Sequence, residues 1–441
     1  MTQIKEAPIE KVTKPIQKFI QNEKAGGIVL GISVVIALIL ANSPLATEYH
    51  HFWEHKFGFL FDGKSYLEYN LHHWINDGLM AIFFFVVGLE LKREFVAGEL
   101  SNPRKALLPI IAAIGGMVVP ALIYLSFNNQ GEVHSGWGIP MATDIAFALG
   151  VLYLLGNRIP FSLKVFLTAL AIVDDLGAVL VIAFFYTSDI SMISLLIGFS
   201  FLLIMYLGNK LGVRSVLFYA LFGIAGLWTA FLLSGVHATI AAVLAAFTIP
   251  ADVKIKENIF MARINKHLTR FRKLDINDKT PTLTNEQLHV LERVKADTNQ
   301  AIPPLQKLEH AMHPMVTFII LPIFALANAG VSVLDINLEE LFNTNIAIGV
   351  ALGLFVGKVV GVVGATWLSV KFKVAPFPEG MNLKNLFGLG LLASIGFTMS
   401  LFVTSLAFTH EEYITQAKIG IFIASIIGGI LGYMVLSRNS E

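Results

Sequence analysis

Long apolar blocks recur through this sequence, and they limit the possible folds more than any other feature. A helix needs about 20 predominantly apolar residues to cross a bilayer, with a range of about 17–25. Twelve segments reach or approach this length: 26–43, 74–91, 106–127, 138–156, 160–186, 191–208, 215–233, 236–250, 314–331, 345–369, 385–407 and 416–436. Only 14% of the residues are charged, against about 25% in soluble domains. The sequence therefore predicts an all-α polytopic membrane protein with twelve transmembrane helices.

The distribution of positive charge predicts how these spans are oriented. Cytoplasmic loops of membrane proteins are enriched in lysine and arginine. With the N-terminus inside, the inside segments other than the long loop 251–313 carry 17 of these residues, whereas the outside loops carry three. We therefore expect both termini to lie in the cytoplasm.

The spans and loops divide the chain into five parts. They are a cytoplasmic tail (1–25), spans 1–8 (26–250, with an outside loop at 44–73), a cytoplasmic insertion loop (251–313), spans 9–12 (314–436) and a second cytoplasmic tail (437–441). In the outside loop, Phe57–Leu67 alternates around an Asp-Gly pair, which predicts a small β-hairpin. In the insertion we expect one helix around Asn258–Phe271 and a second that starts at Thr284, where Gln287 can complete a capping box.

Composition excludes several classes of function. Cysteine is absent, so disulfides, iron–sulfur clusters and cysteine-based zinc sites are excluded. The formal net charge of +1 argues against a nucleic-acid partner, which requires a basic surface. We find no motif that predicts a cofactor, and the insertion has no motif of an enzyme domain.

Ionisable side chains lie inside the predicted spans, where they are costly and usually mark function. They are Asp77, Glu90, Asp144, Asp174, Asp175 and Lys358, with His237 near the start of span 8. The most informative are Asp174 and Asp175, which stand together near the centre of a 27-residue apolar block. The pair is either satisfied by structural partners or forms a site where a proton and a hard cation compete for the same oxygens.

Helical geometry separates the two aspartates. Successive residues of a helix point about 100° apart, so Asp174 and Asp175 should have different partners. One carboxylate can face the ion path. The other can reach Lys358, the only cation that we place deep within a span.

Spans 4 and 11 are poor continuous helices. Gly138-Ile139-Pro140 precedes Asp144 in span 4, and span 11 has a matching weakness in Gly388–Gly390, Gly396 and Thr398. Broken helices leave half-helix ends and unpaired backbone groups at membrane depth. An acidic side chain stabilises the positive N-terminal ends. Asp144 can thus be a structural counter-charge or an ion ligand.

For each of the remaining ionisable residues, two roles are possible. Asp77 lies near a span end, where a cap or interface role is the simpler one. Glu90 and Glu309 lie near the cytoplasmic edge and can form solvated ion pairs or sense cytoplasmic pH. His237 can pack against its neighbours or respond to pH.

Seven motifs resemble those of the NhaA-type sodium/proton antiporters of bacteria. In chain order they are NDGLMA from Asn76, VGLELKRE from Val87, ATDIAFALG from Ala142, DDLGA from Asp174, SGVHAT from Ser234, FALANAG from Phe324 and GFTMS from Gly396. The resemblance implies inverted three-helix repeats, spans 3–5 and 10–12, with broken spans 4 and 11 crossing at the site. It implies exchange of cytoplasmic Na⁺ or Li⁺ for external H⁺, a homodimer with a contact at the outside hairpin, and a place in the bacterial inner membrane.

The resemblance also implies roles for individual residues. Asp175 is expected to be the principal Na⁺ ligand. Asp174 is expected to contribute to the Na⁺ site and to carry a proton, pairing with Lys358 in one state. Thr143 and Asp144 are expected beside the site. The candidates for pH regulation are Glu90, Glu309 and His237.

The chain departs from the family pattern at two places. Val359 follows the span-10 lysine where the family usually has proline, which bears on the local helix geometry. The loop 251–313 is also much longer than in the best-known members, and it borders Glu309.

Three other functions fit parts of the pattern. A sodium-coupled carrier of another solute would want more polar residues than spans 4, 5, 10 and 11 offer. An intramembrane aspartyl protease could use Asp144 and Asp174, but its Gly-x-Gly-Asp motif is absent, because Ala171-Ile172-Val173 precedes Asp174. A channel is the third, and pH changes driven by sodium gradients in both directions would favour exchange over it. The sequence favours a pH-regulated, electrogenic Na⁺/H⁺ antiporter for sodium and pH homeostasis, and not an enzyme.

Overall fold

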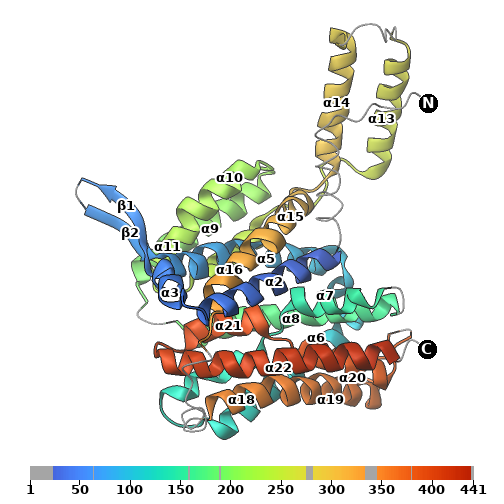
Figure 1. The fold of residues 1–441 in the computed structure, drawn as a ribbon. Helices are drawn as coiled ribbons and strands as arrows, with labels where there is room; N and C mark the ends of the chain where they lie inside the picture. The colour runs from blue at the N-terminus through green and yellow to red at the C-terminus, as the bar shows by residue number, and fades with distance from the viewer. Residues whose placement is uncertain are drawn as a thin grey trace.

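The computed structural model describes residues 23–62, 64–156, 159–187, 190–274, 282–332, 345–378 and 380–438. Most of the predicted N-terminal tail, residues 1–22, lies outside this part, as do residues 439–441 and Gly63 of the predicted hairpin turn. The described chain is mainly helical, with one small sheet. Figure 1 shows most helices side by side in one bundle, from which β1–β2 and α13–α14 project.

Eight helical segments of the described chain are long and apolar enough to cross a membrane, or ten if each of two bent helix pairs is one span. The eight are Leu71–Ala97, Pro103–Phe127, Glu132–Leu154, Phe161–Phe185, Met192–Lys210, Pro304–Asn328, Ile346–Lys371 and Glu411–Arg438. The bent pairs are Ala25–Ala41 with Ala46–Glu54, and Leu383–Ala393 with Phe397–Ala407. Two shorter apolar helices, Val216–Leu232 and Ala238–Thr248, lie at the predicted spans 7 and 8. The chain is thus a multi-pass membrane protein, and the number twelve stays a prediction.

Several spans combine more than one type of helix. The helical elements of the bundle are α2 (Glu23–Ala41), α3 (Ala46–Glu54), α4 (Leu71–His73), η1 (Trp74–Leu79), α5 (Met80–Ala97), η2 (Glu99–Ser101), α6 (Pro103–Phe127), η3 (Glu132–Met141), α7 (Ile145–Leu154), α8 (Phe161–Phe185), α9 (Met192–Lys210), α10 (Val216–Ala220), η5 (Leu221–Trp228), α11 (Thr229–Leu232), α12 (Ala238–Thr248), α15 (Pro304–Met315), η6 (Val316–Ile320), α16 (Leu321–Asn328), α18 (Ile346–Leu352), η7 (Gly353–Gly357), α19 (Lys358–Lys371), α20 (Leu383–Ala393), α21 (Phe397–Ala407) and α22 (Glu411–Arg438). Four of them, η1, η5, η6 and η7, are π-helical turns within apolar helices. Such turns are rare and often occur at functional sites.

The expected interruptions of spans 4 and 11 are observed. The chain is extended between η3 and α7, and α20 meets α21 at a bend of 45°. The first half of span 4 differs from the expectation, because η3 is a 3₁₀ helix rather than an α-helix. Pro140 near its end has no amide hydrogen to continue an α-helical ladder. The two breaks meet, since the Asp144 amide donates a 2.6 Å hydrogen bond to the Ile395 carbonyl.

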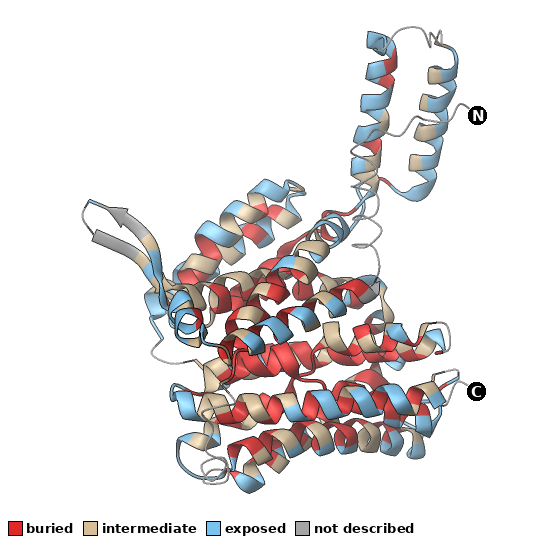
Figure 2. Ribbon diagram, in the orientation of Figure 1, coloured by how far each residue is buried: buried red, intermediate tan, exposed pale blue. Residues whose placement is uncertain are grey.

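The helices α6 and α19 pack closely against each other. A Cβ atom on Gly115 would lie 2.4 Å from the Gly361 carbonyl oxygen, and one on Gly361 would lie 2.2 Å from the Gly115 carbonyl oxygen. Only glycine fits on both sides, so the two backbones touch. In Figure 2, buried residues gather inside the bundle, while many of its outward-facing residues and most of α13–α14 are exposed.

Two hairpins project from the bundle, and the β-hairpin and the two helices of the insertion were predicted. β1 (Lys56–Phe61) and β2 (Lys64–Asn70) pair antiparallel. In the insertion, α13 (Glu257–Arg272) and α14 (Asn285–Ala301) pack against each other. Thr284 and Gln287 form the predicted capping box at the start of α14.

We expect the substitution Gly361→Ala to lower the free energy of unfolding by about 1–3 kcal/mol, because a methyl group would overlap the backbone of α6. Thermal unfolding in detergent measures this. Gly364→Ala is the matched control on the same helix, because a Cβ atom there meets no atom within 4 Å. Equal melting temperatures for the two variants would contradict the close crossing.

Candidate ion-binding site

Asp174 and Asp175 lie midway along α8 and are both buried. The Nζ atom of Lys358 lies 2.6 Å from Oδ2 of Asp174, and both side chains are fully buried. Lys358 is the only buried cation among the described residues. Gly116 of α6 packs against α19, the helix that carries Lys358, because a Cβ atom there would lie 2.8 Å from a methyl group of Val362. One aspartate therefore pairs with the lysine, as helical geometry predicted, and it is Asp174.

The second oxygens of the two aspartates have no partner. Oδ1 of Asp174 and Oδ1 of Asp175 are buried and accept no hydrogen bond. A buried carboxylate without partners is costly. A proton or a hard cation bound at these oxygens would remove that cost, because such cations prefer carboxylate and carbonyl oxygens. The donor set thus fits the exchange of a cation for a proton.

Asp144 acts as a cap for two helices at once. Its Oδ1 accepts a 3.0 Å bond from the Phe147 amide at the start of α7. Its Oδ2 accepts a 2.9 Å hydrogen bond from the amide of Thr398 and a second hydrogen bond from the hydroxyl of the same residue, in the first turn of α21. A negative charge is favourable at both N-termini. Because both oxygens are already engaged, the geometry favours the counter-charge reading of Asp144.

Thr143 joins the two broken spans and lies beside the aspartates. Its hydroxyl donates a 2.9 Å hydrogen bond to the Ala393 carbonyl at the end of α20. The residue is completely buried next to the Asp174 carboxylate. Ser400 makes a similar cross-link, donating to the Ile139 carbonyl in η3. Thr143, Thr398 and Ser400 therefore tie the two interruptions together around the aspartates.

The helix around Lys358 stays regular despite the family departure. Val359 continues α19, and Lys358 has ordinary α-helical dihedral angles. The irregularity precedes the lysine, in the π-helical turn η7. The two glycines Gly353 and Gly357 are the only features of the sequence that mark this turn.

A second charged cluster lies where α5 meets α15. Arg93 is its centre, with nitrogen atoms 3.0 Å from Glu309, 3.1 Å from Glu94 and 3.9 Å from Glu90. The structure thus brings together Glu90 and Glu309, which lie far apart in the sequence. Arg93 was missed as a site residue, although its place in the motif LKRE beside Glu90 was a usable signal.

His237 does not join this cluster. It lies at the start of α12, where its Nε2 is 2.8 Å from the Tyr186 carbonyl at the end of α8. The three candidates for pH regulation, Glu90, Glu309 and His237, therefore lie at two different places in the bundle.

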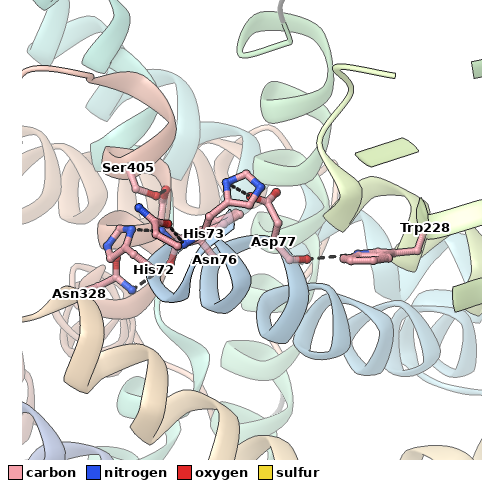
Figure 3. A network of polar contacts seen from close by, with 9 residues as sticks. His72, His73, Asn76, Asp77, Trp228, Asn328 and Ser405 are labelled. Atoms are coloured by element: carbon pink, nitrogen blue, oxygen red, sulfur yellow. Dashed lines mark hydrogen bonds and ion pairs between the residues drawn. The ribbon is translucent and has the colours of Figure 1, made fainter. Parts of the chain in front are cut away.

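Asp77 belongs to a polar network on η1, drawn in Figure 3. Its carboxylate lies 3.4 Å from Nδ1 of His73, and its carbonyl accepts a bond from the Trp228 indole. Asn76 accepts a 3.0 Å bond from Asn328 in the same network. The cap or interface reading of Asp77 thus agrees with its contacts, which join η1 to η5.

Comparison with known proteins places the chain in a family. A sequence profile described as "Na+/H+ antiporter 1" matches residues 17–436. The chain belongs to this family. It is 50% identical to "Na(+)/H(+) antiporter NhaA" of Oleidesulfovibrio alaskensis over 98% of this chain and 96% of the relative. It is 48% identical to "Na(+)/H(+) antiporter NhaA 1" of Saccharophagus degradans, over 98% and 93% of the two chains.

The Asp144 cap gives a test of how the site is held. Replacing Thr398 by valine keeps the side-chain shape but removes a hydroxyl donor to a buried carboxylate. We expect a loss of about 1.5–3 kcal/mol in the free energy of unfolding, because hydrogen bonds to charged groups are of this strength. Thr398→Ser retains the hydroxyl and is the matched control in the same thermal unfolding assay. If both variants unfold alike, the hydroxyl bond does not hold the crossing.

Proposed function

We infer that the protein is a secondary transporter that exchanges Na⁺ for H⁺ across a membrane. Membership of the Na⁺/H⁺ antiporter family supports this, as do relatives that carry this name over nearly their whole length. The observation that carries the inference is the unpartnered oxygen on each of two adjacent buried aspartates. Li⁺, which prefers the same oxygen ligands, is proposed as a second substrate.

The two aspartates have different roles in this proposal. Asp175 is the principal cation ligand, because it has no ion-pair partner among the described residues. Asp174 exchanges its Lys358 partner for a proton during the cycle and contributes its free oxygen to the cation. Thr143 is near enough to assist, whereas Asp144 stabilises the two helix ends.

Alternating access links the two ions. The deprotonated pair binds Na⁺ from the cytoplasm, and the protein turns outward and releases it. Protons then neutralise the carboxylates and allow the return. Because a proton and Na⁺ exclude each other, one site is sufficient for exchange. Two carboxylates can carry more protons inward than cations outward, which supports an electrogenic cycle that the membrane potential helps to drive.

The placement in the cell is also a proposal. We propose twelve spans with inverted repeats, which the two interruptions support. We also propose that both termini lie in the cytoplasm and that the membrane is the bacterial inner membrane, and the charge distribution supports this orientation. The projecting β1–β2 hairpin offers free strand edges to a second copy, which supports a homodimer.

Regulation by pH is proposed for the cluster around Arg93. Three carboxylates, Glu90, Glu94 and Glu309, share one guanidinium there. The cluster joins α5 to α15, so a change in its protonation alters the contact between two helices. His237, at the start of α12, is a second candidate that acts elsewhere.

Asp175→Asn tests the site. We expect Na⁺-driven proton movement in inverted vesicles, followed with a pH-sensitive dye, to fall to the rate of vesicles without the protein at every pH. Asp174→Asn is the matched control, because it should retain Na⁺-induced thermal stabilisation while losing proton coupling. Near-normal exchange by Asp175→Asn would end the assignment, and the opposite pattern of Na⁺ stabilisation would reverse the two roles.

Arg93→Gln tests the regulatory cluster. We expect the pH at which exchange is half-maximal to move toward alkaline values, by about one unit, because three carboxylates lose their shared cation. Arg104→Gln is the control, because Arg104 is exposed and close in sequence. An unchanged pH profile for Arg93→Gln, with normal protein levels, would exclude the cluster from regulation.

A further inference from the structure

The helical hairpin α13–α14 has one polar side, which an ion-pair network marks. Asp297 on α14 lies 3.0 Å from Arg263 and 2.9 Å from His267, both on α13. Burial would raise the pKa of Asp297, but these hydrogen bonds and charges outweigh it and lower the pKa below its ordinary value. The network holds the two helices in register and defines the polar side of the hairpin.

The opposite side of the hairpin is apolar and exposed. At 100° per residue, Met261 and Leu268 share the side of α13 that points away from Arg263. Leu288 and Leu291 share the side of α14 that points away from Asp297. The four side chains are between 41% and 51% exposed. We call Met261, Leu268, Leu288 and Leu291 the apolar face.

The hairpin carries an excess of positive charge, although charges of both signs lie next to the apolar face. Arg272 lies four residues after Leu268 and Lys295 lies four residues after Leu291, whereas Glu257 and Glu292 are the acidic residues at the same spacing from Met261 and Leu288. The described residues of 252–274 and 282–301 carry nine lysines and arginines against five acidic residues. Two such hairpins repel each other, whereas a surface of anionic lipid headgroups attracts them.

The hairpin extends sideways from the bundle of spans. Figure 1 shows α13 and α14 running across the direction of spans such as α22 and projecting beyond the edge of the bundle. The two ends of the insertion are joined at its base, because the Leu305 amide donates a 3.1 Å hydrogen bond to the Pro250 carbonyl and the Lys254 amide donates a 3.0 Å hydrogen bond to the Gln300 carbonyl. The region beside the bundle is lipid in a membrane protein.

We propose that the apolar face of α13–α14 docks on anionic phospholipids of the adjacent leaflet. The four apolar side chains enter the boundary between headgroups and acyl chains, and Arg272 and Lys295 bind the phosphates around them. Amphipathic helices with an excess of positive charge lie on anionic membranes in this way. The hairpin is thus a monotopic anchor added to a polytopic protein.

The absence of cysteine makes a direct test possible. Single spin labels are placed at Leu268→Cys and Leu291→Cys on the apolar face. The matched control is Ile259→Cys, since Ile259 is an apolar residue, 45% exposed, on the Arg263 side of α13. The full-length protein is reconstituted in nanodiscs of phosphatidylcholine, with or without phosphatidylglycerol. Collision rates with oxygen and with a water-soluble nickel chelate are then measured.

With phosphatidylglycerol, we expect the labels at 268 and 291 to gain collisions with oxygen and lose collisions with the nickel chelate. The label at 259 should stay accessible to water. Replacing Arg272 and Lys295 by glutamine should raise the phosphatidylglycerol fraction needed for half of this effect, by about fivefold for each cation. An unchanged spectrum at 259 shows that the hairpin itself remains folded.

Two results would overturn the proposal. The apolar-face labels could stay fully accessible to the nickel chelate at every lipid composition. They could also be protected equally in detergent micelles, with dipolar broadening between labels, which would assign the face to a second copy of the chain.

Discussion

The buried ion pair between Asp174 and Lys358 is the interaction on which the rest of the site depends. Two opposite charges in a membrane interior are tolerated because they are 2.6 Å apart and hydrogen-bonded. Removing one partner of such a pair typically costs about 3–5 kcal/mol. Asp175, one residue further on, has no such partner among the described residues. The pair thus makes one carboxylate stable and leaves the next one available to an ion.

The broken spans solve a related problem for the backbone. Interrupted helices expose amide and carbonyl groups to an environment with no water to satisfy them. Asp144 accepts bonds from the first turns of both α7 and α21, and Thr143 donates to the end of α20. Charged and hydroxyl side chains therefore replace the missing helical hydrogen bonds. The same residues hold the crossing next to the aspartates.

Much of this arrangement could be predicted from the sequence, and the limits have physical causes. Apolar block length located the eight to ten spans that are long enough to cross a membrane, the Asp-Gly pair located the β-hairpin, and the Thr284–Gln287 pattern located the start of α14, because these signals are local. Helical spacing predicted that one aspartate would pair with Lys358, but the choice of Asp174 required the family resemblance. The Arg93 cluster, the double cap by Asp144 and the π-helical turn before Lys358 were not predicted. Each depends on residues more than 200 positions apart or on backbone geometry that no local pattern encodes.

The contact between Gly115 and Gly361 has a mechanical consequence. Two peptide planes that touch have no side chain between them that could adopt another rotamer, so the crossing cannot slide in small steps. We therefore expect the helices α6 and α19 to move together as one rigid part, with the Lys358 ammonium attached to it. Any motion that opens the site to one side and closes it to the other has its boundary elsewhere, where helices meet through longer side chains.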